Sequence, residues 1–284
     1  MRKLFVTVIS CLGLLLSALP QTLEETFAFA MDEWKHGKPA VALPAFRRVT
    51  FFSTGHLQSV SALYAARCYA ALSEPHRGMA QVNVALGSID NIDTLYQDLI
   101  LQKAFIYLQM EEYNKAITTL LDLPLTEGTN EQMKKLVYQG IAYFQMGYYP
   151  VSQSYFIQAN ANDTVKMQIA YLFNQIDVAE KRYNPKRARW FSIFIPGSGQ
   201  VIAGHPGKGI HSFSLNAASV ALFIILYNQY TPLDAALSAF PWIRRFYAGN
   251  IKNAYQLSFT RLQDEKEIIY RKLVEINTPL LYEE

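Results

Sequence analysis

The sequence predicts an all-α fold in which a helical repeat solenoid is followed by a helical, membrane-associated hairpin. Three observations lead to this prediction. The first part of the chain repeats itself with a period of about 36 residues. A glycine-rich apolar stretch, residues 190–227, comes next. In residues 251–276, apolar side chains recur at helical spacing with charged side chains opposite, which is typical of an amphipathic helix.

These observations divide the chain into four parts. Residues 1–20 are predicted to be a signal peptide and 21–184 a repeat array with a capping helix. Residues 185–250 are predicted to form the glycine-rich hairpin domain, and 251–284 an amphipathic helical tail. Pro185 sets the boundary after the array, because proline breaks a helix that would otherwise run through it.

The leader has the composition of a secretory signal. Arg2 and Lys3 precede an apolar run that ends at Leu16, and small residues follow. We therefore expect export to the cell envelope, with the repeat array in the periplasm. The segment ending in Cys11 resembles a lipoprotein cleavage box, so lipidation of Cys11 stays open. Without the leader, Cys68 is the one remaining thiol, and no internal disulfide is expected.

The overall composition excludes some partners. Charged residues make up 17% of the chain and hydrophobic residues 51%. A soluble helical protein normally carries about 25% charged residues. The net charge of +3 gives no reason to expect a nucleic-acid partner.

The repeats are clearest where Leu101–Leu121 is compared with Val137–Ile157. Small residues recur at fixed spacing, which lets two antiparallel helices approach closely. They are Ala30, Ala42, Ala66, Gly78, Ala104, Ala116, Gly140 and Ser152. Gly37 and Gly147 are predicted to end the first helix of their units. Pro44 is predicted to shorten or kink the second helix of the first unit.

This pattern resembles the tetratricopeptide repeat, a helix–turn–helix unit. The resemblance implies a concave groove lined by first-helix residues: Phe27, Met31, Trp34, Leu63, Arg67, Leu101, Phe105, Leu108, Val137, Ile141 and Phe144. Such a surface is too apolar to face water. Either these residues belong to the core, or the groove is filled by a partner's helix or by the chain's own tail.

The stretch 190–227 contains two bends and a long apolar run. The bends are Pro196-Gly197-Ser198-Gly199-Gln200 and the segment from Gly204 to Gly209. Ile210–Tyr227 follows, with about 18 residues, near the lower limit for a transmembrane helix. Gln200 is expected to hydrogen-bond across the bend, satisfying backbone groups that lipid cannot. A buried soluble core is the alternative interpretation.

Glycine-rich bends also suggest nucleotide binding, but the spacing excludes it. A phosphate-binding loop around Lys208 would need glycine at Ile202 and a hydroxyl residue at Gly209. Ser198 lacks the spacing of a nucleophile elbow. The histidines and cysteines show no metal-ligand spacing. We therefore predict no nucleotide, cofactor, metal or catalytic site; an enzyme would need polar side chains converging beside Pro196.

Basic residues precede the apolar stretch. Lys181, Arg182, Lys186, Arg187 and Arg189 lie just before Trp190, a pattern that suits anionic lipid head groups and an interfacial tryptophan. Positive charge usually stays on the cytoplasmic side, whereas export would place these residues outside. Either the first apolar segment re-enters the membrane without crossing it, or the basic residues contact a different leaflet.

A second resemblance covers residues 188–258. The residues that carry it are Pro196, Gly197, Gly199, Gln200, Gly204, Gly207, Gly209, Tyr247, Gly249 and Asn250. They resemble a domain of bacterial envelope proteins in which such a hairpin follows a signal peptide and helical repeats. Val201 and Ile202 stand where that pattern often has an aromatic residue. The resemblance implies a membrane-associated hairpin, and it brings no established activity that could be carried over to this chain.

The sequence thus predicts a non-enzymatic envelope adaptor that is tethered to a membrane. Its expected partners are membrane lipid and a protein of unknown identity, bound by the groove. The alternative is an assembly or insertion helper for membrane or cell-surface proteins, in which the hairpin itself engages the client.

Overall fold

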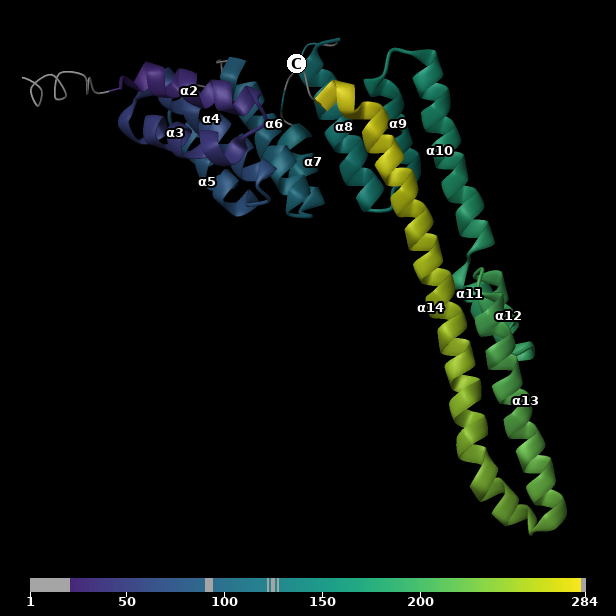
Figure 1. The fold of residues 1–284 in the computed structure, drawn as a ribbon. Coiled ribbons are helices and arrows are strands. Elements are labelled where there is room, and N and C mark those ends of the chain that lie inside the picture. Colours follow the sequence, from purple (N-terminus) through teal and green to yellow (C-terminus); the bar gives the residue numbers. More distant parts are fainter. Residues whose placement is uncertain (1–20, 90–93, 122, 124–125, 127, 282–284) are drawn as a thin grey trace, which may run out of the picture. The chain divides into compact units, whose positions relative to one another are not determined.

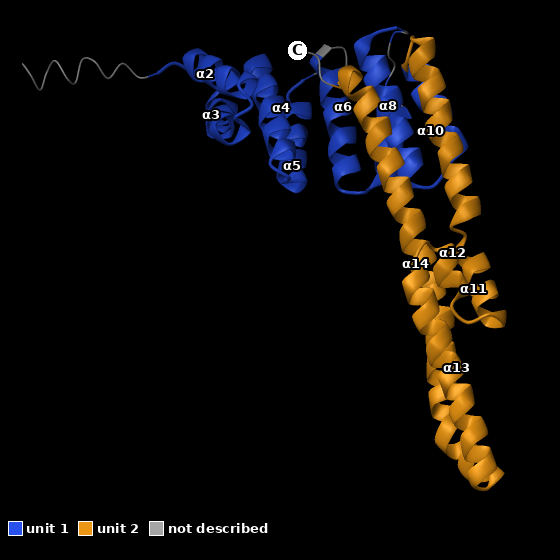
Figure 2. Cartoon of the chain, turned by 45° about the vertical axis from the view of Figure 1, so that its right-hand side comes forward, with its two compact units in different colours: residues 1–159 blue, residues 160–284 orange. Residues whose placement is uncertain are grey.

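The computed structural model describes residues 21–89, 94–121, 123, 126 and 128–281. Every regular element in these residues is a helix, which confirms the all-α prediction. The predicted signal peptide, with Cys11, lies outside the described residues. The chain forms two compact units, residues 1–159 and 160–284, coloured separately in Figure 2.

Unit 1 consists of helices packed in series, each against the next (Figure 1). Successive helices form the pairs α2/α3, α4/α5, α6/α7 and α8/α9. Their bounds are α2 Leu23–Lys35, α3 Pro39–Phe52, α4 Gly55–Ala71, α5 Pro75–Leu86, α6 Thr94–Gln109, α7 Tyr113–Leu121, α8 Asn130–Gln145 and α9 Tyr149–Ala159.

Recurring backbone signals set the turns within the pairs. In all four pairs, the second residue after the first helix is left-handed, with φ of 69° at Gly37, 60° at Ser73, 59° at Glu111 and 81° at Gly147. Glycine adopts this conformation without strain. Pro39 and Pro75 start α3 and α5 at the first helical position, where the missing N–H has no partner to lose. The predicted helix ends at Gly37 and Gly147 are confirmed.

Small residues lie where the paired helices touch. All eight small residues selected by the repeat are buried. A Cβ at Gly78 would lie 3.2 Å from the carbonyl oxygen of Ala66. Ser152 Oγ donates to the carbonyl oxygen of Gly140 over 2.7 Å. Pro44 lies inside α3, which continues to Phe52, so the predicted shortening does not occur.

Unit 2 contains α10 Asp163–Arg182, α11 Pro185–Phe194, α12 Ser198–Ile202, α13 Pro206–Gln229 and α14 Pro232–Leu281. α10, expected to cap the array, belongs to this unit, so the units divide before the boundary predicted at residue 184. That boundary is the break between α10 and α11, where Pro185 starts the new helix. α14 runs unbroken through residue 250, so the tail continues the hairpin's second helix.

The two long partners of α14 hold unit 2 together. α13 runs antiparallel beside the first part of α14, and α10 packs against its last part (Figures 1 and 2). Leu262 packs with Ala179 and Tyr183 of the α10 end. The Lys266 ammonium lies 2.7 Å from a carboxylate oxygen of Glu180. The amphipathic face of the tail is therefore used within unit 2.

Candidate functional site

The bend between α11 and α13 brings four helices into backbone contact. Gly197 has a φ of 91°, and a Cβ there would overlap the carbonyl of Gly209. A Cβ on Gly199 would overlap the carbonyl oxygen of Ala188 and come within 2.7 Å of Ala254. These glycines are required because no side chain fits between α11, α12, α13 and α14 at this level.

A buried hydrogen-bond network, which we term the junction network, fixes the bend to α14. Asn250 is 2% exposed, and its Oδ1 accepts from three groups. The donors are Gly197 N at 2.8 Å, Gln200 Nε2 at 3.1 Å and Ser212 Oγ at 3.0 Å. Asn250 Nδ2 donates to the carbonyl oxygen of Ser192 over 2.8 Å. One side chain of α14 therefore binds α11, the bend and α13.

Gln200 and Ser192 complete the junction network. Gln200 Nε2 also donates to the carbonyl oxygen of Asn250 over 3.1 Å. Ser192 Oγ accepts from Gly199 N over 2.9 Å and donates to Gln200 Oε1 over 3.4 Å. Nearby, Tyr247 OH donates to the carbonyl oxygen of Ile193 over 2.8 Å. Buried polar groups paired in this way specify a single arrangement of the helices.

The structure thus assigns physical roles to most of the motif residues. Pro196 precedes the bend, and Gly204, with a φ of 84°, ends the short helix α12. Gly207 and Gly249 have open space where a Cβ would stand. Sequence reasoning missed Ser192 and Ser212. A polar residue inside an apolar stretch was the available signal for both.

Beyond the junction network, α13 and α14 form an apolar arm, which we define as residues 217–243. The helices touch through small side chains: Ser219, Ala235 and Ala239 are buried. Large apolar side chains point outward instead, including Leu233 and Leu237, each 68% exposed, and Phe240, 62% exposed. Small residues at the contact and large apolar residues outside are typical of helices that pack in lipid.

One helix among the described residues is long and apolar enough to cross a membrane. It is α13, Pro206–Gln229, whose most apolar 18-residue window has a mean hydropathy of 1.7 and is 17% buried. Low burial distinguishes α13 from a core helix of similar composition.

Exposed basic residues lie in the segments of α11, α13 and α14 that adjoin the base of the arm. We term this set the basic collar: Lys186, Arg187, Arg189, Lys208, Arg244, Arg245 and Lys252, all exposed. None of them forms an ion pair with another described residue. Asp234, near the tip, is the sole acidic residue between positions 184 and 263.

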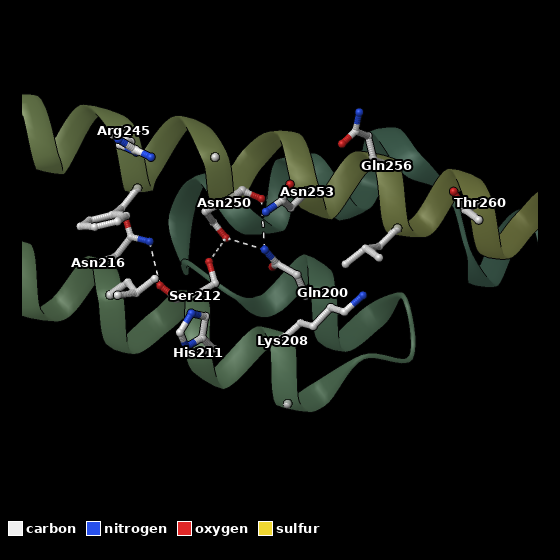
Figure 3. A pocket seen from close by; sticks show the side chains of 15 residues that line it. Gln200, Lys208, His211, Ser212, Asn216, Arg245, Asn250, Asn253, Gln256 and Thr260 are labelled. Atoms are coloured by element: carbon white, nitrogen blue, oxygen red, sulfur yellow. Dashed lines mark hydrogen bonds between the residues drawn. The ribbon is translucent and has the colours of Figure 1, made fainter.

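An open cavity of about 640 Å³ lies between α13 and α14 at the junction network (Figure 3). Its cationic lining consists of Lys208 and Arg245 of the collar, with His211 beside them. Asn253 and Gln256 of α14 add neutral amides, and the lining contains no acidic residue.

The predicted groove residues of unit 1 fall into two groups. Leu63, Leu101, Val137, Ile141 and Phe144 are buried, and Leu63 and Leu101 belong to hydrophobic clusters of the array. They therefore do not line an open groove. The remaining six are half-buried and partly used in packing: Phe27, Met31, Trp34, Arg67, Phe105 and Leu108. For example, the Trp34 and Tyr64 rings lie 6.2 Å apart, and Arg67 lies 3.6 Å from Asp98.

Two findings on the described residues concern metal binding and thiol chemistry. The described residues contain no group of three or more His, Cys, Asp or Glu side chains that could hold a metal ion. Cys68 is buried, and desolvation raises the pKa of its thiol to about 12. The thiolate is therefore scarce at neutral pH.

Comparisons with known proteins identify no relative. No protein-family model, curated protein or solved structure matches the chain. The geometry of unit 2 is therefore the basis for a functional proposal.

Proposed function

We propose that the protein is a non-enzymatic adaptor of the cell envelope, in which the apolar arm tethers a tetratricopeptide-like array to a membrane. The observation that carries this proposal is the inverted packing of the arm. Leu233, Leu237 and Phe240 are exposed while Ala235 and Ala239 are buried. Exposed apolar surface costs about 25 cal/mol per Å² in water, and lipid removes that cost.

The basic collar supports a membrane that contains anionic lipid. Each Lys or Arg near such a surface contributes about 1 kcal/mol of attraction. The exposed Trp190 and Trp242 lie among these basic residues, where tryptophan favours the membrane–water interface. The charge and the aromatic residues both support a membrane surface at the base of the arm.

The arm is too short for both of its helices to cross a bilayer. The apolar part of α14, Pro232–Ile243, ends at Arg244 and Arg245. At 1.5 Å per residue it is about 18 Å long, against about 30 Å for the hydrocarbon core. In our proposal the arm therefore enters one leaflet and returns. The collar then stays on one face of the membrane, which reconciles export with the positive charge before Trp190.

The array is the part of the adaptor that binds a protein partner. Because Leu63, Leu101, Ile141 and Phe144 are buried, the partner surface in this proposal is smaller than the predicted groove. It retains the half-buried residues Phe27, Met31, Trp34, Arg67, Phe105 and Leu108. The array's exposed surface, including the Phe51 and Phe52 rings at the end of α3, supplies further contacts.

Vesicle flotation tests the tether. We expect the full chain to float with protein-free phosphatidylcholine vesicles and to stay bound through a carbonate wash. The double variant Ile225→Asn/Leu237→Asn should bind at least about tenfold more weakly, since each change exposes an amide to hydrocarbon. The matched control Phe51→Asn/Phe52→Asn alters two exposed apolar residues of the array and should float like the unmodified chain.

A labelled tip in the same vesicles tests the depth of the arm. A cysteine at Thr231 should be protected from a membrane-impermeant maleimide added outside, and it should stay protected when the reagent is also trapped inside. Labelling from inside would show that the arm crosses the bilayer. Equal flotation of both double variants would reject the tether. Binding only when a membrane protein is present would favour the assembly-helper function.

A further inference from the structure

The cavity between α13 and α14 carries unneutralised positive charge at the base of the arm. Lys208 and His211 project from α13 and Arg245 from α14, on either side of the junction network (Figure 3). None of these three side chains has a hydrogen-bond or ion-pair partner among the described residues. Cationic side chains at the two ends of a cavity without acidic residues favour an anion.

The floor of the cavity is polar, rigid and already satisfied. Gln200, Asn216 and Asn250 line it and are 1%, 8% and 2% exposed. Gln200 and Asn250 hydrogen-bond each other, and Asn216 Nδ2 donates to the carbonyl oxygen of Ser212 over 2.8 Å. The side-chain donors left for a ligand are therefore on the walls: Lys208, His211, Arg245, Asn253, Gln256 and Thr260.

The register of the hairpin places the cavity where a lipid head group would lie. Ser212 and Asn250 are hydrogen-bonded across the helices. Arg245 lies five residues from Asn250 toward the tip, where the apolar arm begins, and Lys208 lies four residues from Ser212 in the opposite direction. Half-buried Leu215 and Phe246 line the cavity beside Arg245. Arg245 thus lies at the end of the cavity next to the arm, and Lys208 lies at the other end.

We propose that this cavity binds the phosphate and polar head of an anionic phospholipid, an inference that rests on the proposed membrane tether. Arginine and lysine are the side chains that proteins use most for phosphate oxygens. The cavity volume of about 640 Å³ exceeds what a bare phosphate needs and lies within the range of small-ligand sites. Cations at the two ends of the cavity, with the amides of Asn253 and Gln256 toward the Lys208 end, suit a phosphodiester that carries a second polar group.

Titration of the full chain in a neutral maltoside detergent tests the site without a charged membrane surface. We expect saturable binding of dihexanoyl phosphatidylglycerol and none of dihexanoyl phosphatidylcholine. The variant Lys208→Gln/Arg245→Gln should bind at least about tenfold more weakly, as expected when charge-assisted hydrogen bonds to phosphate are lost. The matched control Arg189→Gln/Lys252→Gln removes the same charge from collar positions outside the cavity and should bind within about twofold of the unmodified chain.

Glycerol 3-phosphate, titrated in parallel, distinguishes a lipid from a soluble phosphate. Weak binding of glycerol 3-phosphate supports the lipid source, whereas equally tight binding overturns it and assigns the cavity to a free phosphate compound. Equal losses in the two double variants, or no binding of either phosphate, would reject the site. Helical content, measured by circular dichroism, confirms that each variant is folded. Because this titration needs no bilayer, its failure is separate from a failure of the flotation experiment.

Discussion

The two ends of α14 differ in whether their large apolar side chains are exposed or buried. In the arm, Leu233 and Leu237 are each 68% exposed, and alanines face the neighbouring helix. Toward the C-terminus, Leu262 is 8% exposed and Leu273 is fully buried. One continuous helix therefore exposes its large apolar side chains at one end and buries them at the other. This difference indicates that its two ends are adapted to different surroundings.

The charges follow the same division. In the C-terminal part, Arg261 lies 2.9 Å from Glu265, and Arg271 lies 3.0 Å from Glu267. In the arm, Asp234 is the sole charged residue of α14 before Arg244. The C-terminal part is thus stabilised by apolar burial with a charged outer face, as in water. The arm has neither buried large apolar side chains nor a charged outer face, and its two helices are held together by close contact between small residues.

Asn250 lies between these two parts, and its loss should have the largest effect. Asn250→Ala removes the acceptor for Gly197 N, Gln200 Nε2 and Ser212 Oγ and the donor to Ser192. An unsatisfied buried group costs about 1–3 kcal/mol, so we expect a loss of about 3–5 kcal/mol in the free energy of unfolding. Urea titration in neutral detergent, followed by circular dichroism and tryptophan fluorescence, measures it.

Asn253→Ala is the control for this change. Asn253 is exposed, lies one turn further along α14 and forms no hydrogen bond with another described residue. Its removal should change the free energy of unfolding by less than about 0.5 kcal/mol. Equal effects of the two variants would mean that the junction network does not hold the arm to the rest of unit 2.

The same substitution at the two ends of α14 should affect different properties. Leu273→Ala creates a cavity in a buried position and should lower the free energy of unfolding by about 2–5 kcal/mol. Leu237→Ala should leave it nearly unchanged but weaken binding to phosphatidylcholine vesicles by about tenfold. Urea titration measures the free energy of unfolding of both variants, and vesicle flotation measures their binding to vesicles. If Leu237→Ala lowers the free energy of unfolding, the exposed apolar side chains of the arm belong to a surface that another protein covers, and not to one that lipid covers.

Local signals in the sequence predicted much of this structure. Proline and glycine mark helix ends because their effects on the backbone are local: Pro185 starts α11 and Gly147 follows α8. Small residues at a regular period identified the contacts within helix pairs. Ser73 and Glu111 carried no such signal, although they adopt the same left-handed conformation as Gly37 and Gly147.

Contacts between residues that are far apart in the chain could not be predicted from the sequence. In a helical array the first helix of a unit is covered by its partner and by the next unit. The spacing of Leu63 or Leu101 therefore does not distinguish a groove from a core. The continuity of α14 was missed because the hairpin and the tail were divided after residue 250, yet the helix runs from Pro232 to Leu281, with Pro241 and Gly249 inside it. The bond between Gln200 and Asn250 joins positions 50 residues apart, and no period encodes it.

The smallest expected effect comes from the ion pairs of the C-terminal part. The Lys266 side chain is 15% exposed and lies 2.7 Å from Glu180 on α10, whereas the pair of Arg271 with Glu267 is open to solvent. Lys266→Gln should therefore lower the free energy of unfolding by about 1 kcal/mol and Arg271→Gln by less than about 0.5 kcal/mol. Urea titrations at low and at about 1 M salt measure both, since salt screens exposed pairs more than covered ones. If Arg271→Gln has the larger effect, the last part of α14 is stabilised mainly by contacts within its own helix and not by α10. The proposed difference between this part, held by a neighbouring helix, and the arm would then be wrong.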